Sequence, residues 1–268
     1  MFYNAKNGSI KIENTDMDYI SFGYGDKPLV MIPGLGDGIR TVKGSVVTFA
    51  LMYREYAKNY KVYVFSRKNH LEKGYSTRDM ARDQKIAMEK LGIARADIMG
   101  VSQGGMIAQY IAIDYPEVVN KLILVVTLSR QNEVVHSVVN KWIGMAKSGD
   151  YRELMIDTAE KMYTEKYLKK YRLFYPILGS VGKPKDFSRF IIMANACVNH
   201  NAYDALNKIT ASTFVIGGDS DKVVGSGSSE EIAERISGSK LFIYKGLGHS
   251  AYEEAKDFNR LVLEFLDN

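Results

Sequence analysis

The sequence predicts an α/β fold, in which helices cover both faces of a mainly parallel β-sheet and a helical region is inserted. Three observations carry this prediction. Short apolar runs alternate with longer segments of helical period, the pattern of strand–helix–strand units. The chain has 268 residues, 46% of them hydrophobic, so it can bury a large core within one domain. The alternation stops between residues 129 and 206, where helical patterns continue without strand-like runs.

The expected elements follow from local patterns in chain order. Two N-terminal apolar runs, residues 9–13 and 18–22, flank a turn-rich Asn-Thr-Asp and predict a hairpin. Later strands are expected at residues 29–32, 62–65, 97–101, 122–126, 214–217 and 241–244. Helices are expected at residues 46–59, 77–91, 105–114, 229–236 and 252–266. Pro116 disfavours helical geometry at Tyr115, so the third of these helices should end there.

The helical region interrupts the strand pattern between residues 126 and 214. We therefore expect an α/β core formed by residues 1–128 and 207–268, with residues 129–206 as a helical cap. Residues 151–175 of this cap are rich in Tyr, Met, Leu and Phe, which can line an apolar pocket but more often pack helices together. The candidates for lining it are Met155, Met162, Tyr163, Phe174 and Tyr175.

Composition argues against several classes of protein. The formal charge of +5 and the pI near 9.0 are mildly basic, but the charges are interspersed, so nucleic-acid binding is not expected. Cys197 is the only cysteine and cannot form an intramolecular disulfide. No apolar run approaches the roughly 18 to 20 residues that a membrane-spanning helix needs. The N-terminus has no apolar signal region, so we expect a cytoplasmic protein that binds no membrane and is monomeric or weakly oligomeric.

The segment Gly100-Val101-Ser102-Gln103-Gly104 lies between a predicted strand and a predicted helix. In this context a G-x-S-x-G pattern places its serine on a strained bend at the carboxyl edge of the sheet. The glycines allow close packing of backbone and helix there. The N-terminus of the helix supplies unpaired N–H groups and a positive dipole end, both suited to an oxyanion. Ser102 is therefore the predicted nucleophile.

A serine hydroxyl needs a base to take its proton, and the base needs an acid to orient it. His249 lies in a glycine-rich loop between the last predicted strand and the C-terminal helix, at the sheet edge where such a base must stand. The other histidines, His70, His136 and His200, are expected at exposed or structural positions. His249 is therefore the predicted base.

The acid should come from another loop at the same edge. The loop after the strand at residues 214–217 offers two carboxylates, Asp219 and Asp221. A turn-forming role fits Asp219 at least as well as a functional one. With either aspartate the chain order is Ser, Asp, His, one of the three orders known for serine hydrolases.

Across nearly its full length the chain resembles the α/β-hydrolase fold family. Besides the serine pentapeptide, the matching stretches are VMIPGLG at residues 30–36, GYST at 74–77, residues 214–224, and Gly248-His249. In this family the acid follows the glycine that ends its strand in a G-x-x-D pattern, which here implies Asp221. The resemblance also implies an oxyanion hole formed by the backbone N–H groups of Gln103 and Leu35.

Two stretches depart from the family pattern. Many relatives have His-Gly where this chain has Pro33-Gly34, a change that leaves the backbone donors intact. Many also have an Asp-x-Arg-Gly-x-Gly loop where this chain has SRKNHL at residues 66–71. Because that loop borders the site, substrates cannot be carried over from relatives.

A serine at the bend argues against the haloalkane dehalogenase and epoxide hydrolase types, which use an aspartate there. The residue types imply acyl transfer to water from a small ester, thioester or lactone through an acyl-enzyme, with no metal or organic cofactor. Three alternatives stay open. They are a ligand-binding protein without turnover, an acyltransferase, and a carbon–carbon bond hydrolase or lyase.

Two further clusters have a structural interpretation that we favour. Lys166, Lys169, Lys170 and Arg172 would attract an anionic carrier such as acyl carrier protein or coenzyme A, but a solvated helix face is the simpler account. Cys197 and His200 lie three residues apart on an expected helix, and two ligands do not make a zinc site.

Overall fold

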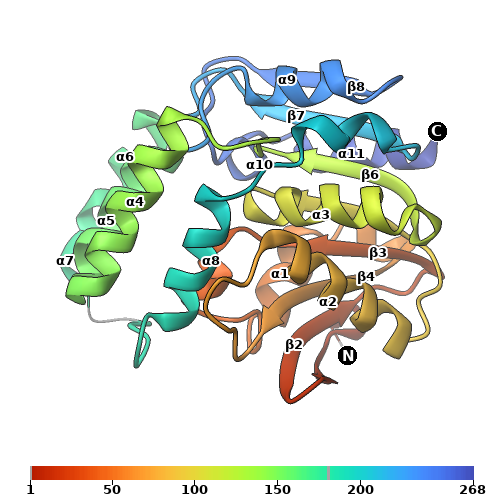
Figure 1. Cartoon of the computed structure of the whole chain (residues 1–268), viewed down its shortest axis with the longest axis horizontal. Helices are drawn as coiled ribbons and strands as arrows, with labels where there is room; N and C mark the ends of the chain where they lie inside the picture. Colours follow the sequence, from red (N-terminus) through yellow and green to blue (C-terminus); the bar gives the residue numbers. More distant parts are fainter. Residues whose placement is uncertain (1, 180–181) are drawn as a thin grey trace.

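The computed structural model describes residues 2–179 and 182–268 and is built around one twisted sheet (Figure 1). Its order within these residues is β1-β2-β4-β3-β5-β6-β7-β8. The strands are β1 (Lys6–Ile12), β2 (Thr15–Phe22), β3 (Lys27–Ile32), β4 (Tyr60–Lys68), β5 (Ala96–Val101), β6 (Val119–Val125), β7 (Ser212–Gly218) and β8 (Lys240–Tyr244). β2 pairs antiparallel with both β1 and β4, whereas all neighbours from β4 to β8 are parallel. The predicted α/β class with a mainly parallel sheet is confirmed.

Both faces of the sheet are covered, as the continuous apolar strands require. Along β3, Val30 and Ile32 face one core cluster, which also contains side chains of α2 (Thr77–Lys90), α3 (Gln103–Asp114) and α9 (Ser228–Arg235). Leu29 and Met31 face the opposite cluster, with α1 (Val46–Met52) and α11 (Phe258–Asp267). The alternation along the strand thus builds two cores with helices on either side.

Two expected helices are each split, and these predictions are wrong in that respect. The pattern at residues 46–59 forms α1 and then only a 3₁₀ turn, η3 (Tyr56–Lys58). Tyr53 and Tyr56 are buried as a helical stripe predicts, but the tighter turn lets the chain enter β4 at Tyr60.

The second split falls in the C-terminal helix expected at residues 252–266. It forms as α10 (Ala251–Glu254) and α11, with Ala255 in an extended conformation between them. The break lets Tyr252 face a cavity while Phe258 packs under the sheet.

A helical region separates β6 from β7. It contains α4 (Glu133–Ser148), α5 (Tyr151–Met162), α6 (Glu165–Tyr171), α7 (Tyr175–Leu178) and α8 (Ser188–Val198). In Figure 1, α4 to α7 stand together at one side of the sheet, and α8 lies between them and the core helices. α8 packs against both α4 and the turn η2 (Leu35–Gly38), so it links the region to the core. The division into core and cap stays a prediction.

No helix in the described ranges combines the length and the apolar character needed to cross a bilayer.

Candidate active site

Ser102 lies at the junction of β5 and α3 in a backbone conformation that non-glycine residues rarely adopt. Its φ and ψ angles are 54° and −119°. The neighbouring glycines are required by space, because a Cβ on Gly104 would lie 1.9 Å from the carbonyl oxygen of Ile32. A Cβ on Gly100 would lie 2.4 Å from the carbonyl oxygen of Gly104. The start of α3 therefore sits directly against β3 and β5, and the bend holds the serine out of the sheet.

Three side chains from distant parts of the chain form a line of hydrogen bonds at this bend. His249 Nε2 lies 2.9 Å from Ser102 Oγ, and its Nδ1 lies 2.8 Å from Asp221 Oδ2. His249 and Asp221 are both buried. Because an ionised carboxylate only accepts hydrogen bonds, the proton of a neutral His249 belongs on Nδ1, which leaves Nε2 free to accept from the serine. The arrangement can take a proton from Ser102 Oγ.

The structure separates the two aspartates of the loop after β7. Asp221 Oδ1 accepts the backbone N–H groups of Val223 and Val224 at 2.8 and 3.0 Å, which aims its other oxygen at His249. Asp219 instead accepts the N–H of Gly246 at 2.7 Å, and this bond lowers the pKa of its carboxyl group. Asp221 thus contacts the histidine, while Asp219 fastens two loops together.

The two predicted oxyanion donors begin separate helical turns beside the serine. Leu35 is the first residue of η2 and Gln103 the first of α3, so neither backbone N–H has an acceptor within its own helix. A Cβ on Gly34 would lie 3.3 Å from Ser102 Cβ, which places this loop against the serine. The N–H of Asp37 bonds to the carbonyl oxygen of Gly34 at 3.2 Å and so orients the peptide that carries the Leu35 N–H. Their assignment as donors stays a prediction.

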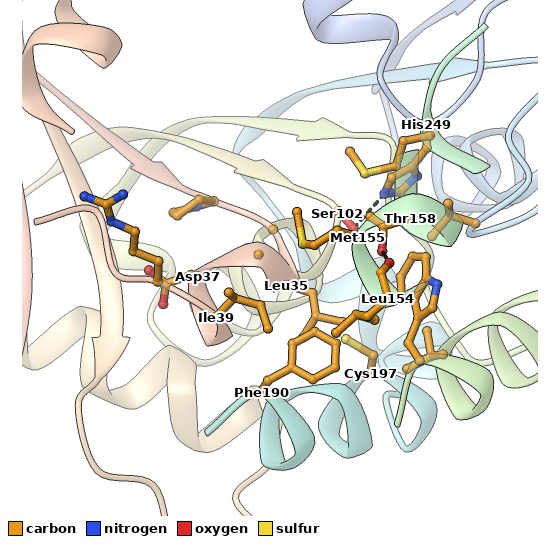
Figure 2. A pocket seen from close by; sticks show the side chains of 18 of the residues that line it. Leu35, Asp37, Ile39, Ser102, Leu154, Met155, Thr158, Phe190, Cys197 and His249 are labelled. Carbon is orange, nitrogen blue, oxygen red and sulfur yellow. Dashed lines mark hydrogen bonds between the residues drawn. The ribbon is translucent and has the colours of Figure 1, made fainter. Parts of the chain in front are cut away.

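A cavity of about 530 Å³ opens at the serine, in the size range of sites for small molecules. In the view of Figure 2, Ser102 and His249 lie together at one end and Asp37 and Ile39 at the other. The lining includes an apolar stripe of α4, which recurs with helical spacing at Val135, Val139 and Trp142. That spacing is visible in the sequence, but which face of α4 meets the cavity is not.

Of the five cap residues that were expected to line the pocket, two line the cavity and three do not. Met155 and Met162 line the cavity. Tyr163 does not, because its hydroxyl donates to Glu253 at 2.6 Å. Phe174 is 54% exposed, and the Tyr175 hydroxyl donates to Glu160 at 3.0 Å. Two cavity residues that the sequence reasoning missed, Phe190 and Tyr252, come from α8 and α10.

The remaining candidates take structural positions. His200 is buried, with Nδ1 2.9 Å from Thr77 Oγ1, and burial lowers the pKa of its imidazole to about 3. His136 pairs with Asn140 on an exposed helix face. Cys197 lines the cavity, and burial raises the pKa of its thiol to about 12.

Two clusters from the sequence remain, and binding of an anionic carrier at the basic one stays untested. Of the basic residues on α6 and beside it, Arg172 is paired with Glu160 and Glu165 at 2.7 and 2.5 Å. No group of three or more metal-ligating side chains gathers at one point in the described residues.

Comparison with known proteins places this arrangement in context. A family model described as "alpha/beta hydrolase fold" matches residues 27–256. A 2-hydroxy-6-oxononadienedioate/2-hydroxy-6-oxononatrienedioate hydrolase of a Pseudomonas species is 26% identical over 280 residues, covering 97% of this chain and 92% of the relative. An alpha/beta hydrolase enzyme from a Medee basin deep-sea metagenome library has a TM-score of 0.84 at 20% identity, covering 97% of this chain and 98% of its own. The enol-lactonase of Burkholderia xenovorans has a TM-score of 0.81 at 18% identity, with 97% and 100% covered. At these identities the two solved structures show a shared fold.

Proposed function

The chain belongs to the alpha/beta hydrolase fold family, and on this basis we propose that it is a serine hydrolase of carboxylic esters, lactones or related acyl compounds. The observation that carries the proposal is the hydrogen-bonded line from Ser102 through His249 to Asp221, at one end of a largely apolar cavity. These are the residue types and contacts that an activated serine nucleophile requires.

In the first half of the proposed reaction, Ser102 Oγ attacks the substrate carbonyl carbon and gives its proton to His249 Nε2. The Asp221 carboxylate stabilises the resulting imidazolium through Nδ1. The N–H groups of Leu35 and Gln103 hold the oxyanion of the tetrahedral intermediate. When this intermediate collapses, the alcohol leaves with the proton from Nε2, and the acyl group stays on Ser102.

In the second half, water replaces the alcohol. It loses a proton to His249 Nε2 as its oxygen attacks the acyl-enzyme carbonyl. The second tetrahedral intermediate releases the carboxylic acid, and Ser102 Oγ takes back its proton. The sum is hydrolysis of one acyl bond, with the enzyme unchanged.

Carbon–carbon bond hydrolysis is a second candidate, favoured by the likeness to the Pseudomonas hydrolase. Its named substrate is a keto dicarboxylate without an ester bond, so hydrolysis there must break a carbon–carbon bond. A dianion needs cationic partners when it is buried. Among the described residues that line the cavity, Arg40 is the one cationic side chain, and Asp37 also lines it. Because the Asp37 carboxylate is itself paired with Arg67 and Arg189, Arg40 could pair with one carboxylate of a substrate, which supports a neutral or singly charged substrate and keeps acyl hydrolysis as the leading proposal.

The proposal is tested first by intact-mass labelling with a fluorophosphonate, which needs no knowledge of the substrate. Wild type should gain one adduct on Ser102, and Ser102→Ala and His249→Ala should gain none. His136→Ala, which removes an exposed histidine from α4, is the matched control and should label as wild type does. A folded wild-type protein without an adduct would refute the proposal and favour a ligand-binding protein.

Product assays then separate the reactions that share this serine. We expect p-nitrophenyl esters or lactones to be hydrolysed faster than a 6-oxo-dienedioate. The reverse order would favour the carbon–carbon candidate, and transfer to an added alcohol in preference to water would indicate an acyltransferase.

A further inference from the structure

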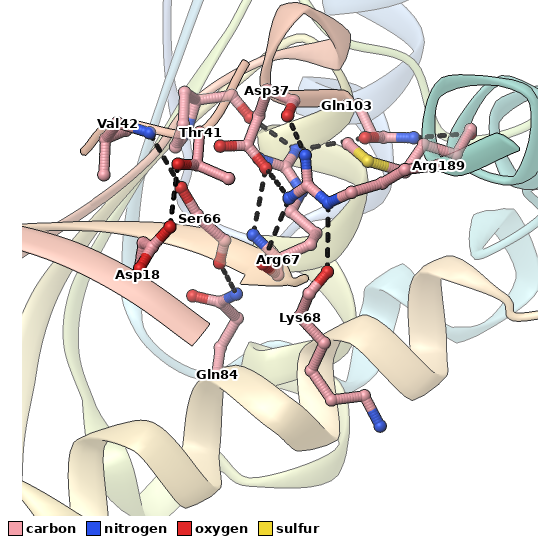
Figure 3. Close-up of polar contacts among 12 residues, drawn as sticks. Asp18, Asp37, Thr41, Val42, Ser66, Arg67, Lys68, Gln84, Gln103 and Arg189 are labelled. Carbon is pink, nitrogen blue, oxygen red and sulfur yellow. Dashed lines mark hydrogen bonds and ion pairs between the residues drawn. The ribbon is translucent and has the colours of Figure 1, made fainter. Parts of the chain in front are cut away.

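Behind the proposed oxyanion donors lies a buried polar cluster that the mechanism above does not use. Figure 3 shows Arg67 at its centre, with Asp37, Gln103 and Arg189 around it. Arg67 lies at the end of β4, and its side chain is fully buried. Burial lowers the pKa of its guanidinium to about 10, so the group stays charged at neutral pH. Burying such a charge is costly unless its surroundings are arranged to accept it.

One nitrogen of Arg67 touches both segments that carry the proposed donors. Nη2 donates to the carbonyl oxygen of Pro33 at 2.5 Å and to Gln103 Oε1 at 3.1 Å. Pro33 lies two residues before Leu35, and Gln103 itself carries the second donor. The loop after β3 and the start of α3 are therefore tied to the same guanidinium.

The arginine and its amide partner are themselves held in place. Asp37 Oδ2 accepts the backbone N–H of Arg67 at 3.0 Å and lies 3.8 Å from its Nη1. Arg189, on α8, donates to the same carboxylate oxygen at 2.5 Å and to the carbonyl oxygen of Arg67 at 3.0 Å. Gln103 Nε2 donates to the carbonyl oxygen of Met193 on α8 at 2.6 Å, which turns Oε1 toward Arg67.

We propose that Arg67 is a positioning residue of the oxyanion hole, which holds the N–H groups of Leu35 and Gln103 at the spacing that a tetrahedral oxyanion requires. The inference rests on the proposed function and on the assignment of these two donors. Its physical basis is that such donors stabilise charge only when they are positioned before the reaction. A misplacement of about 1 Å can cost about 100-fold in rate.

The kinetic test compares Arg67→Met and Arg67→Lys with wild type on p-nitrophenyl butyrate. Arg67→Met removes both hydrogen bonds, and we expect kcat to fall about 10- to 100-fold with KM changed less than about threefold. Arg67→Lys keeps the charge but replaces the planar fork with one compact ammonium group, so it should restore only part of kcat. Arg95→Met is the matched control, because it removes an arginine that also donates to a backbone carbonyl oxygen, that of Val119, at the end of the sheet away from Ser102. Its kcat should stay within about threefold of wild type.

A second readout separates positioning from general damage to the fold. Ser102 Oγ adds to the carbonyl carbon of an alkyl trifluoromethyl ketone and forms a hemiketal. The oxyanion of this hemiketal occupies the place of the oxyanion in the tetrahedral intermediate. The pKa of the hemiketal, followed by fluorine NMR, reports how well the donors stabilise the oxyanion. A tenfold loss of stabilisation raises this pKa by about one unit, so we expect a rise of one to two units in Arg67→Met and none in Arg95→Met.

The possible results distinguish a failure of the proposed function from a failure of the inference about Arg67. A wild-type protein that is neither labelled nor active overturns the proposed function, and the inference with it. An active wild type with unchanged kcat and hemiketal pKa in Arg67→Met overturns the inference alone, as does an Arg95→Met loss equal to that of Arg67→Met. If circular dichroism shows that Arg67→Met is unfolded, Arg67→Lys decides, and wild-type values in that variant contradict the inference.

Discussion

At the scale of single residues, the site depends on how each polar group is oriented rather than on its presence. Asp219 and Asp221 are two residues apart and chemically identical. They differ because backbone N–H groups of Val223 and Val224 turn Asp221 toward His249, whereas Asp219 bonds to the neighbouring loop. The G-x-x-D pattern of the resembling family implied Asp221 as the acid, and of the two aspartates Asp221 is the one that contacts His249; its catalytic role stays a prediction.

The two aspartates therefore make a matched pair of variants. Asp221→Asn should lower kcat by about 10² to 10⁴, because an amide cannot stabilise the imidazolium or hold its tautomer. Asp219→Asn should lower kcat less than about threefold, because this side chain contacts the Gly246 loop and not His249. Steady-state kinetics on one p-nitrophenyl ester measures both. A larger loss in Asp219→Asn would show that the acid is assigned to the wrong residue.

At the scale of elements, the packing of α3 against the sheet explains the glycines around Ser102. The strand periodicities predicted every strand of the core within a few residues, because alternation and apolar runs are local signals. The helices at residues 46–59 and 252–266 were expected to be continuous and are not. Their breaks are set by where the next element must begin, which no local pattern encodes.

The closeness of α3 to β3 predicts opposite effects for two glycine substitutions. Gly104→Ala should destabilise the protein by about 3 kcal/mol or more, because the new Cβ would lie 1.9 Å from a backbone oxygen of β3. Gly144→Ala, in the interior of α4, meets nothing within 4 Å and should stabilise by up to about 1 kcal/mol. Urea unfolding measures both free energies. A Gly104→Ala protein as stable as wild type would contradict the packing argument.

His200 joins α2 and α3 beyond the end of α8, and its environment predicts a pH dependence of stability. Its folded-state pKa is lowered to about 3 by burial, whereas the ordinary value is 6.5. Between these pH values the unfolded chain binds a proton at this site that the folded protein does not, so stability falls as pH falls through this window. One such proton contributes a slope of about 1.4 kcal/mol per pH unit.

Replacing His200 tests whether stability falls as pH falls, as predicted. The His200→Gln variant should lose less stability than wild type between pH 6.5 and pH 4, although its stability at pH 7 is lower because the contact with Thr77 is altered. His136→Gln is the control on an exposed face and should keep the wild-type slope. Chemical unfolding at several pH values gives the slopes, and an unchanged slope in His200→Gln would contradict the prediction.

At the scale of the whole molecule, the cavity lies between the sheet edge and the inserted helices. Its wall combines the loop after β3, the serine bend, and side chains of α4, α5 and α8. These segments are distant in sequence and meet only because β3 and β5 are neighbours in the sheet and the helical region follows β6. The size of this cavity is therefore a property of the assembled fold.

Filling this cavity should change the preferred acyl length. Met155→Trp adds bulk to the α5 wall, so activity on p-nitrophenyl octanoate should fall at least about tenfold more than activity on the acetate. Met145→Trp, on α4 and outside the cavity lining, is the control for a large side chain in the same region. Equal losses on both esters in Met155→Trp would show that the acyl chain lies elsewhere.

The sequence by itself determined the strands, most of the helices, the strained bend at Ser102 and the loops that carry the proposed acid and base. These features rest on residues a few positions apart, where propensity, period and steric limits act. The tertiary structure alone decided which side chains meet across long separations. Ser102 and His249 are 147 residues apart, and Arg67 joins Pro33 to Gln103 through a contact that no motif marked. Such contacts depend on the order of strands in the sheet, and a one-dimensional pattern does not state that order.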